Sequence, residues 1–430
     1  MLYRSYFGVV LSVIVICSCS NDDNILIDNQ TKEKSDGIPF LATISSNVST
    51  TRALSEDGNR IIASWGVGDK VALIHNSVRD EMTVESVDAS GVATISGTLT
   101  GSPSTGDEVY IMYPSSASDD NPYYYKFRKT DFFMGQDGTL TGTNGTSISE
   151  KYDLREGRGT LIVGDKASLD GNVTLENQIA IFKMTLKSVD GTNDITTSEV
   201  IINNGMDYIC ASVNLASPSN TFYLALPLTD LVEVFVKGSD GKNYFNMIDY
   251  DDGALEAKYY KSTVKLATVG DVILSTGKFA KAGTANAAGM IAYLGNSEEA
   301  GCRNGLAIAL KDVSGSTSWS YQKVYASNYT PRILPVGNWQ MPTLMQWQYM
   351  MLGCGSTITP SDSPASSVDC SGLQSKLSAA KGNKLNSRYW TNTQSGSYTW
   401  NVDFGWYSNS AYFAQGGNSF SAYARSCATF

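Results

Sequence analysis

The sequence predicts a mainly β protein, with two β-sandwich domains followed by a C-terminal α+β domain. Three observations carry this prediction. Apolar and polar residues alternate with a period of two in several segments before residue 268. Asp-Gly dipeptides, which favour tight turns, separate these segments. Gly, Ser, Thr, Asn and Tyr are abundant and only 17% of the residues are charged, as expected of an exported, β-rich chain.

Residues 1–18 have the layout of an export signal. The single positive charge of Arg4 precedes an apolar run over 7–17. A membrane-spanning helix needs roughly twenty apolar residues, so this run is too short to be one. The run ends in Ile-Cys-Ser-Cys, which resembles the lipobox of bacterial lipoproteins. The resemblance implies cleavage before Cys19 and a lipid on its thiol; the alternative is an ordinary signal peptide. The next residues, Ser-Asn-Asp-Asp at 20–23, resemble the surface-export signal of Bacteroidetes lipoproteins.

The composition argues against several classes of function. The net charge of −10 is spread along the chain without a basic stripe, so we expect no nucleic acid partner. The single histidine, His75, leaves little scope for histidine-based catalysis or zinc binding. The sequence contains no phosphate loop of the Walker type, and no spacing of carboxylates singles out an acid–base pair. We therefore expect neither an enzyme nor a cofactor.

The predicted β-rich part follows a polar tether over residues 19–37. We place one sandwich at 38–165 and a second at 166–268. The segment IFKMTLK at 181–187 alternates apolar residues with Lys and Thr, and YKSTVKL at 260–266 has the same period. Period two indicates strands of antiparallel sheets with one buried face.

Three motifs in this part suggest a family. They are IPFLATISS followed by TTRA over 38–53, SWGVGDKVALI at 64–74, and KYYKSTVKL at 258–266. Their order behind a lipoprotein-like signal resembles the fimbrillin family of Bacteroidetes pilus proteins, over about half of the chain. The resemblance implies two transthyretin-like sandwiches. It also implies assembly by strand exchange, after a trypsin-like protease cuts behind an arginine and removes the first strand.

The predicted cleavage site is the bond between Arg52 and Ala53. The surrounding TTRALSEDG is polar, so we expect a protease to reach it. Removal of an edge strand leaves unpaired N–H and C=O groups, which a strand of a neighbouring subunit can pair with. The alternative is that Arg52 is a surface residue before a turn.

Residues 269–430 differ from the rest of the chain in their tryptophan content and in their predicted helices. Six of the seven tryptophans lie beyond residue 318. PTLMQWQYMMLG at 342–353 predicts a helix, with a capping box of Thr343 and Gln346 and an end at Gly353. LQSKLSAAKG at 373–382 predicts a second helix. Two short helices with several strands indicate a compact α+β domain.

Four of the seven cysteines lie in this C-terminal region. In an exported chain they predict two disulfides, for which three pairings are open. We favour Cys354–Cys370, which closes a short loop, and Cys302–Cys427, which ties the ends of the domain together. Cys210 is expected to be a small buried residue of a strand.

Five motifs of the C-terminal region resemble C-type-lectin-like domains of bacterial surface proteins. They are GLAIAL (305–310), NWQMPTLMQWQYM (338–350), YWTNTQ (389–394), TWNVDF (399–404) and YARSCATF (423–430). The resemblance implies that irregular loops display a ligand-binding surface, here over 315–332 and 404–423. The candidate ligand-binding residues are aromatic: Trp319, Tyr321, Tyr325, Trp406 and Tyr407. The alternative is that they fill the core of a small domain.

A calcium site is the weaker interpretation of Trp400-Asn401-Val402-Asp403. The Glu-Pro-Asn, Gln-Pro-Asp and Trp-Asn-Asp tripeptides of calcium-dependent lectins do not occur in the sequence. In a strand, Asn401 and Asp403 share one face. Because hard cations need several convergent oxygens, a core strand is favoured, and no metal is expected.

We therefore expect a fimbrial (pilus) subunit at the cell surface, and a tip adhesin in particular, because a folded domain stands where the resemblance places the donated strand. Its expected partners are other pilus subunits bound by β-strand addition, a glycan or a host or bacterial surface protein, and the outer membrane through the lipid of the precursor. Two alternatives stay open: a free-standing surface lipoprotein that binds a glycan or host protein, and a pilus anchor subunit.

Overall fold

About half of the described residues lie in β-strands and few lie in helices, which confirms the predicted mainly β class. The computed structural model describes residues 37–46, 54–58, 60–62, 64–117, 133–142, 144–203, 209–227, 231–249, 258–329, 337–364, 367–407 and 409–430. The predicted export signal and the predicted tether, apart from its last residue Gly37, therefore lie outside the described residues. So do Cys19, Arg52 and Ala53.

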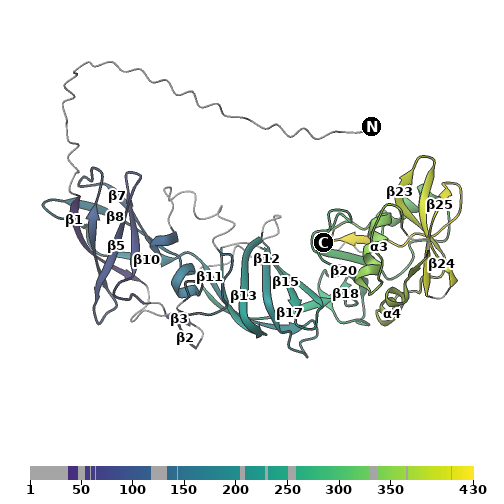
Figure 1. Ribbon diagram of the computed structural model, residues 1–430, viewed down its shortest axis with the longest axis horizontal. Coiled ribbons are helices and arrows are strands. Elements are labelled where there is room, and N and C mark those ends of the chain that lie inside the picture. The colour runs from purple at the N-terminus through teal and green to yellow at the C-terminus, as the bar shows by residue number, and fades with distance from the viewer. Residues whose placement is uncertain are drawn as a thin grey trace, which may run out of the picture. The chain divides into compact units, whose positions relative to one another are not determined.

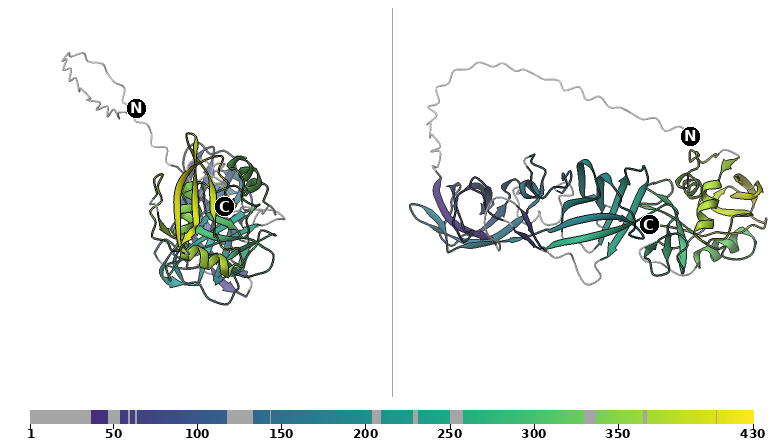
Figure 2. Two further views of the ribbon diagram at one scale, coloured as in Figure 1. Left: turned by 90° about the vertical axis from the view of Figure 1, so that its right-hand side faces the viewer. Right: turned by 90° about the horizontal axis from the view of Figure 1, so that it is seen from below.

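The first sheet has eight strands in the order β10-β1-β6-β5-β4-β7-β8-β9. It closes on itself, because β9 and β10 each pair with both β1 and β8. Its core holds the inward side chains of alternating residues, among them Phe40, Leu73 and Met82. Figures 1 and 2 show these strands in purple and blue. The bounds are β1 Ile38–Ser46, β4 Lys70–His75, β5 Val78–Val87, β6 Ala93–Leu99, β7 Glu108–Tyr113, β8 Arg155–Val163, β9 Ala167–Leu169 and β10 Val173–Asn177.

The first sheet extends past the boundary predicted at residue 165. Both β9 and β10 belong to it, so the sheet ends at Asn177. These two strands are only three and five residues long, so their alternation is too short to assign them to a sheet from sequence. A separate two-stranded hairpin lies between β1 and β4, with β2 at Ser55–Asp57 and β3 at Arg60–Ile62.

The second sheet has seven strands in the order β13-β12-β15-β16-β17-β11-β14. Phe182, Met184 and Leu186 of β11 are buried, as their period of two predicts. The connection between β7 and β8 also contributes to this core, through Phe133 and Ile148 among others. The strand bounds are β11 Ala180–Ser188, β12 Thr197–Asn203, β13 Ile209–Ser219, β14 Thr221–Leu226, β15 Leu231–Gly238, β16 Asn243–Asp249 and β17 Tyr259–Thr268. The same connection carries two short helical turns, η1 at Ser115–Ala117 and η2 at Ile148–Tyr152.

Within its described residues, the C-terminal region combines two sheets with three helices. One sheet has the order β19-β18-β20-β21-β26 and the other β22-β25-β24-β23. The predicted capping box of α3 is formed: the Thr343 side chain accepts from the Gln346 N–H, and Gln346 Oε1 accepts from the Thr343 N–H. The bounds are β18 Val272–Leu274, β19 Phe279–Ala280, β20 Ala287–Leu294, β21 Gly305–Ala309, α2 Trp319–Ser327, α3 Leu344–Gly353, β22 Val368–Asp369, α4 Ser371–Ala379, β23 Arg388–Ser395, β24 Tyr398–Tyr407, β25 Ser410–Gly417 and β26 Cys427–Thr429.

Helix α2 lies where an irregular loop was expected. Its buried residues are Gln322 and Ala326, one turn apart. A face of one glutamine and one alanine has no apolar period, which explains why the sequence pattern did not indicate a helix here.

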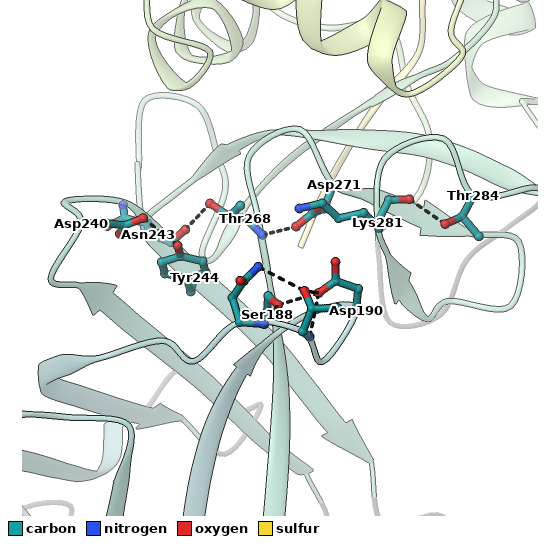
Figure 3. Close-up of polar contacts among 11 residues, drawn as sticks. Ser188, Asp190, Asp240, Asn243, Tyr244, Thr268, Asp271, Lys281 and Thr284 are labelled. Atoms are coloured by element: carbon teal, nitrogen blue, oxygen red, sulfur yellow. Dashed lines mark hydrogen bonds and ion pairs between the residues drawn. The ribbon is translucent and has the colours of Figure 1, made fainter.

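The second sheet and the C-terminal region meet directly. β17 ends at Thr268, whose N–H donates to Asp271 Oδ2 at 3.0 Å and whose hydroxyl donates to the Asn243 carbonyl at 2.8 Å (Figure 3). The rings of Phe245, Phe279 and Phe430 pack on one another, with centroids 5.5–6.1 Å apart. An ion pair between Glu233 and Arg303 adds to this junction. Within the described parts of the chain, no helix is long and apolar enough to cross a membrane.

Candidate functional site: the first strand and its groove

Strand β1 is held on both sides by backbone pairing. It pairs antiparallel with β6 over seven residue pairs, from Ile38–Leu99 to Ile44–Ala93. On its other side it pairs in parallel with β10, and through Phe40 with β9. It therefore fills a slot in the closed first sheet rather than adding to its outside.

The inward face of β1 has a large–small–large pattern. Phe40, Ala42 and Ile44 point into the core and are 2%, 8% and 0% exposed, whereas Leu41 between them is 51% exposed. Full burial of a Phe or an Ile side chain stabilises a fold by about 1.5–3 kcal/mol, so these residues together contribute about 5 kcal/mol. Removal of β1 would leave an apolar groove flanked by unpaired backbone groups of β6 and β10.

The residues after the predicted cleavage site are attached to the other sheet. Leu54 is buried in the core of the second sheet. Glu56 of β2 accepts from the Nζ atoms of Lys183 and Lys261, at 2.7 and 2.6 Å, and from the Tyr223 hydroxyl at 2.5 Å. These hydrogen bonds, that from Lys183 most of all, hold the pKa of Glu56 well below its ordinary value.

Two different sheets thus hold the chain on either side of the predicted cut. β1 ends at Ser46 in the first sheet, and the second sheet holds the chain from Leu54. A cut at 52–53 would separate β1 from everything that follows, and the new chain start would stay attached through Leu54 and Glu56. Sequence inspection did not single out Glu56, because its partners lie more than a hundred residues away.

Strand β26 near the C-terminus is paired along both edges. On one side it pairs with β21, and on the other the N–H and C=O of Cys427 bond to those of Gln340, both at 2.8 Å. Cys427 and Ala428 are fully buried. β26 therefore cannot leave this sheet without disrupting the C-terminal core.

The predicted ligand-binding aromatic residues fall into two groups. Trp319, Tyr321 and Tyr325 lie on α2, where Tyr321 and Tyr325 are 62% and 43% exposed. Trp319 is half-buried, and its Nε1–H donates to the Thr391 carbonyl at 2.9 Å, so it also has a structural contact. Trp406 and Tyr407 lie at the end of β24, but their side chains are outside the described part.

The weak calcium candidates lie inside the fold. Asn401 and Asp403 share a face of β24 and are 2% and 7% exposed. Asp403 accepts from the guanidinium of Arg388 at 3.0 and 3.2 Å. Among the residues described, His, Cys, Asp and Glu form no cluster of three that could hold a metal ion.

The cysteines of the C-terminal region share one core. Cys302, Cys354, Cys370 and Cys427 are buried and carry free thiols, so neither predicted disulfide is formed in this structure, and both pairings stay predictions. Gly372, two residues after Cys370, packs so closely on the Cys354 backbone that a Cβ there would clash with the Cys354 carbonyl oxygen. Burial raises the pKa of the Cys302 and Cys370 thiols to about 11.

Comparison with known proteins gives likenesses at low similarity. No protein-family model and no curated protein matches the chain. A fimbrial protein from Bacteroides ovatus has 13% identity and a TM-score of 0.29, over 92% of this chain and 99% of that one. A candidate cell adhesion protein from Bacteroides fragilis has 13% identity and a TM-score of 0.31, over 56% and 95%. The minor pilin GBS52 from Streptococcus agalactiae has 10% identity and a TM-score of 0.19, over 54% and 96%. These TM-scores are too low for the likenesses to show what this chain does.

Proposed function

We propose that this chain is a surface-exposed pilus subunit that exchanges its first strand, β1, for a strand of a second subunit. One observation carries the proposal. β1 fills a slot with two paired edges and three inward side chains, and the second sheet holds the chain that follows the predicted cut, from Leu54 onward. A strand bound in this way can be replaced by another strand of the same pattern without any change in the rest of the sheet.

The proposed direction of exchange is acceptance without donation. β26 is paired on both edges, and Phe430 packs into the junction with the second sheet. A subunit that accepts a strand but donates none ends a fibre, so we place it at the tip. The exposed Tyr321 and Tyr325 of α2 are then available for a glycan or for a protein on a host or bacterial surface.

The lipid belongs to the precursor in this proposal. Acylated Cys19 would hold the chain at the outer membrane until the bond after Arg52 is cut, which removes the lipid and β1 together. N-terminal mass spectrometry of protein taken from the cell surface separates the alternatives. A mature chain that begins at Ala53 supports strand acceptance, whereas one that keeps acylated Cys19 indicates an anchor subunit or a free-standing lipoprotein and contradicts the proposal.

The groove itself can be tested with a peptide. A chain that starts at Ala53 should bind a labelled peptide of residues 38–46, measured by fluorescence anisotropy. The full chain with β1 in place should not bind it. Phe40→Asp in the peptide should abolish binding, because a carboxylate would enter the apolar core.

The matched control is Leu41→Asp, since Leu41 is the next residue but points outward. It should bind nearly as well as the unchanged peptide. If the two aspartate peptides bind equally well, or if the unchanged peptide does not bind, the groove does not recognise the inward side chains of β1 and the proposal is contradicted.

A further inference from the structure

The end strands of the second sheet are connected by a segment of the chain's own. β13 and β14 are the two ends of this sheet. Gln136, in the connection between β7 and β8, forms an isolated parallel bridge with β13. Its N–H donates to the Ser212 carbonyl at 3.0 Å, and its carbonyl accepts from the Asn214 N–H at 2.7 Å.

On the β14 side, the side chain of Gln136 takes the place of a peptide group. Its Nε2–H donates to the Ala225 carbonyl at 2.9 Å, and its Oε1 accepts from the Ala225 N–H at 2.7 Å. Two residues on, the Gly138 carbonyl accepts from the Tyr223 N–H at 2.8 Å. One fully buried glutamine thus pairs with β13 through its backbone and with β14 through its amide.

This arrangement bears on which sheet receives a donated strand. The end of a sheet presents a row of N–H and C=O groups that pairs readily with any extended chain. If β13 and β14 were open, the second sheet would compete with the β1 slot for an incoming strand. It would also pair with the same edge of another copy of the chain.

We propose that Gln136 determines the specificity of strand exchange by closing the second sheet to strand addition. The inference rests on the proposed function, because it assigns the accepting groove to the first sheet alone. The occupant that Gln136 excludes is an extended strand from a second copy of this chain or from another subunit.

The experiment uses the full chain with β1 in place, so that the first groove stays filled. Wild type and Gln136→Ala are compared by light scattering after size exclusion and by binding of a labelled peptide of residues 133–140. The matched control is Gln374→Ala. Gln374 forms the same pair of hydrogen bonds with the N–H and C=O of Leu385, which is not in a strand.

The Gln136→Ala chain should self-associate and bind the peptide about tenfold more tightly than wild type. A strand can then pair with the N–H and C=O of Ala225 that the glutamine amide occupied, and one or two such hydrogen bonds correspond to about a tenfold change. Wild type and Gln374→Ala should both stay monomeric, and Gln374→Ala should bind no more of the peptide than wild type does. A folded Gln136→Ala chain that stays monomeric and ignores the peptide overturns the proposal.

Gln136→Glu covers the case in which the alanine variant does not fold. It keeps an acceptor for the Ala225 N–H and loses the donor to the Ala225 carbonyl, so weaker association is expected and full monomer behaviour contradicts the proposal. None of these outcomes depends on cleavage or on the β1 slot. A failure of the peptide test on the Ala53 chain would therefore be recognised separately.

Discussion

At the scale of single residues, Glu56 shows how one carboxylate links distant parts of the chain. It lies in the short hairpin after the predicted cleavage site. Its hydrogen-bond and ion-pair partners come from three strands of the second sheet, β11, β14 and β17. The side chain is 21% exposed, so water reduces the energy of each ion pair. The arrangement of the three donors around the carboxylate is unaffected by this screening. Leu54, two residues earlier, already supplies a buried apolar contact with the second sheet. The contribution that we assign to Glu56 is therefore to fix the position of the hairpin on that sheet.

The stability that Glu56 provides should depend on pH in a defined direction. Its pKa is lowered from 4.5 in the folded chain, so the stabilisation is fully present above pH 4.5 and is lost as the pH falls through the lower folded-state pKa. Glu56→Gln should therefore lower Tm at pH 7, and the difference from wild type should shrink in acid. Thermal unfolding monitored by circular dichroism from pH 7 to pH 2 checks this.

Glu108→Gln is the control for the Glu56 experiment. Glu108 lies 3.7 Å from Arg158 with both side chains well exposed, so its loss should change Tm little at any pH. A Glu56→Gln chain with wild-type Tm at neutral pH would contradict the positioning role.

The buried thiols predict when the two disulfides form. Burial raises the pKa of Cys354 to about 12 and that of Cys302 to about 11, which leaves very little reactive thiolate at neutral pH. Oxidation should therefore occur during folding and not afterwards. Refolding with oxidised glutathione should give Cys354–Cys370 and Cys302–Cys427 by non-reducing peptide mapping, whereas the same reagent added to folded, reduced protein should react slowly. Fast oxidation of the folded chain, or other pairings, would show that this order is wrong.

At the scale of elements, alternation and capping could be predicted and long-range pairing could not. The inward face of β11 and the capping box of α3 follow from local residue spacing, and both are as predicted. Helix α2 has no apolar stripe, and β9 and β10 are too short to show a period, so local patterns did not place them. The contacts of Glu56 and Gln136 join residues that lie far apart in the sequence, where spacing carries no information.

Helix α2 presents two roles for neighbouring aromatic residues. Tyr321→Ala and Tyr325→Ala together should leave Tm unchanged, because both rings are exposed, and should reduce attachment of cells or purified protein to the target surface. Trp319→Ala should instead lower stability by about 1–3 kcal/mol, since it removes half-buried aromatic area and the bond to the Thr391 carbonyl. Chemical denaturation and an attachment assay separate the two effects.

Tyr398→Ala serves as the control for the α2 double variant, because Tyr398 is a similarly exposed tyrosine on β24. It should leave both Tm and attachment unchanged. If the double variant attaches like wild type while the Tyr398 variant does not, the ligand-binding surface lies on the strands and not on α2.

At the scale of the whole molecule, each described sheet has a different role in the proposed strand exchange. The first sheet has one strand that a cut can release, the second sheet holds the new chain start, and the C-terminal region keeps β26 paired on both edges. In the proposed exchange, accepting a strand and donating one therefore belong to different parts of the chain, and moving a strand from one part to another should separate them.

This division predicts how the cleaved chain behaves alone. In the proposed exchange, a chain that starts at Ala53 would have an open groove, and its described strands include none that is free to be donated, so it should stay monomeric in size-exclusion light scattering. Attachment of the sequence of residues 38–46 behind Phe430 through a flexible linker supplies a donor strand, and the resulting chain should form linear polymers visible by electron microscopy. The same fusion with Phe40→Asp in the attached copy should stay monomeric, because its strand cannot fill the inward pockets. Polymers of the unmodified Ala53 chain would mean that it donates a strand after all, and the proposed place at the fibre end would then be wrong.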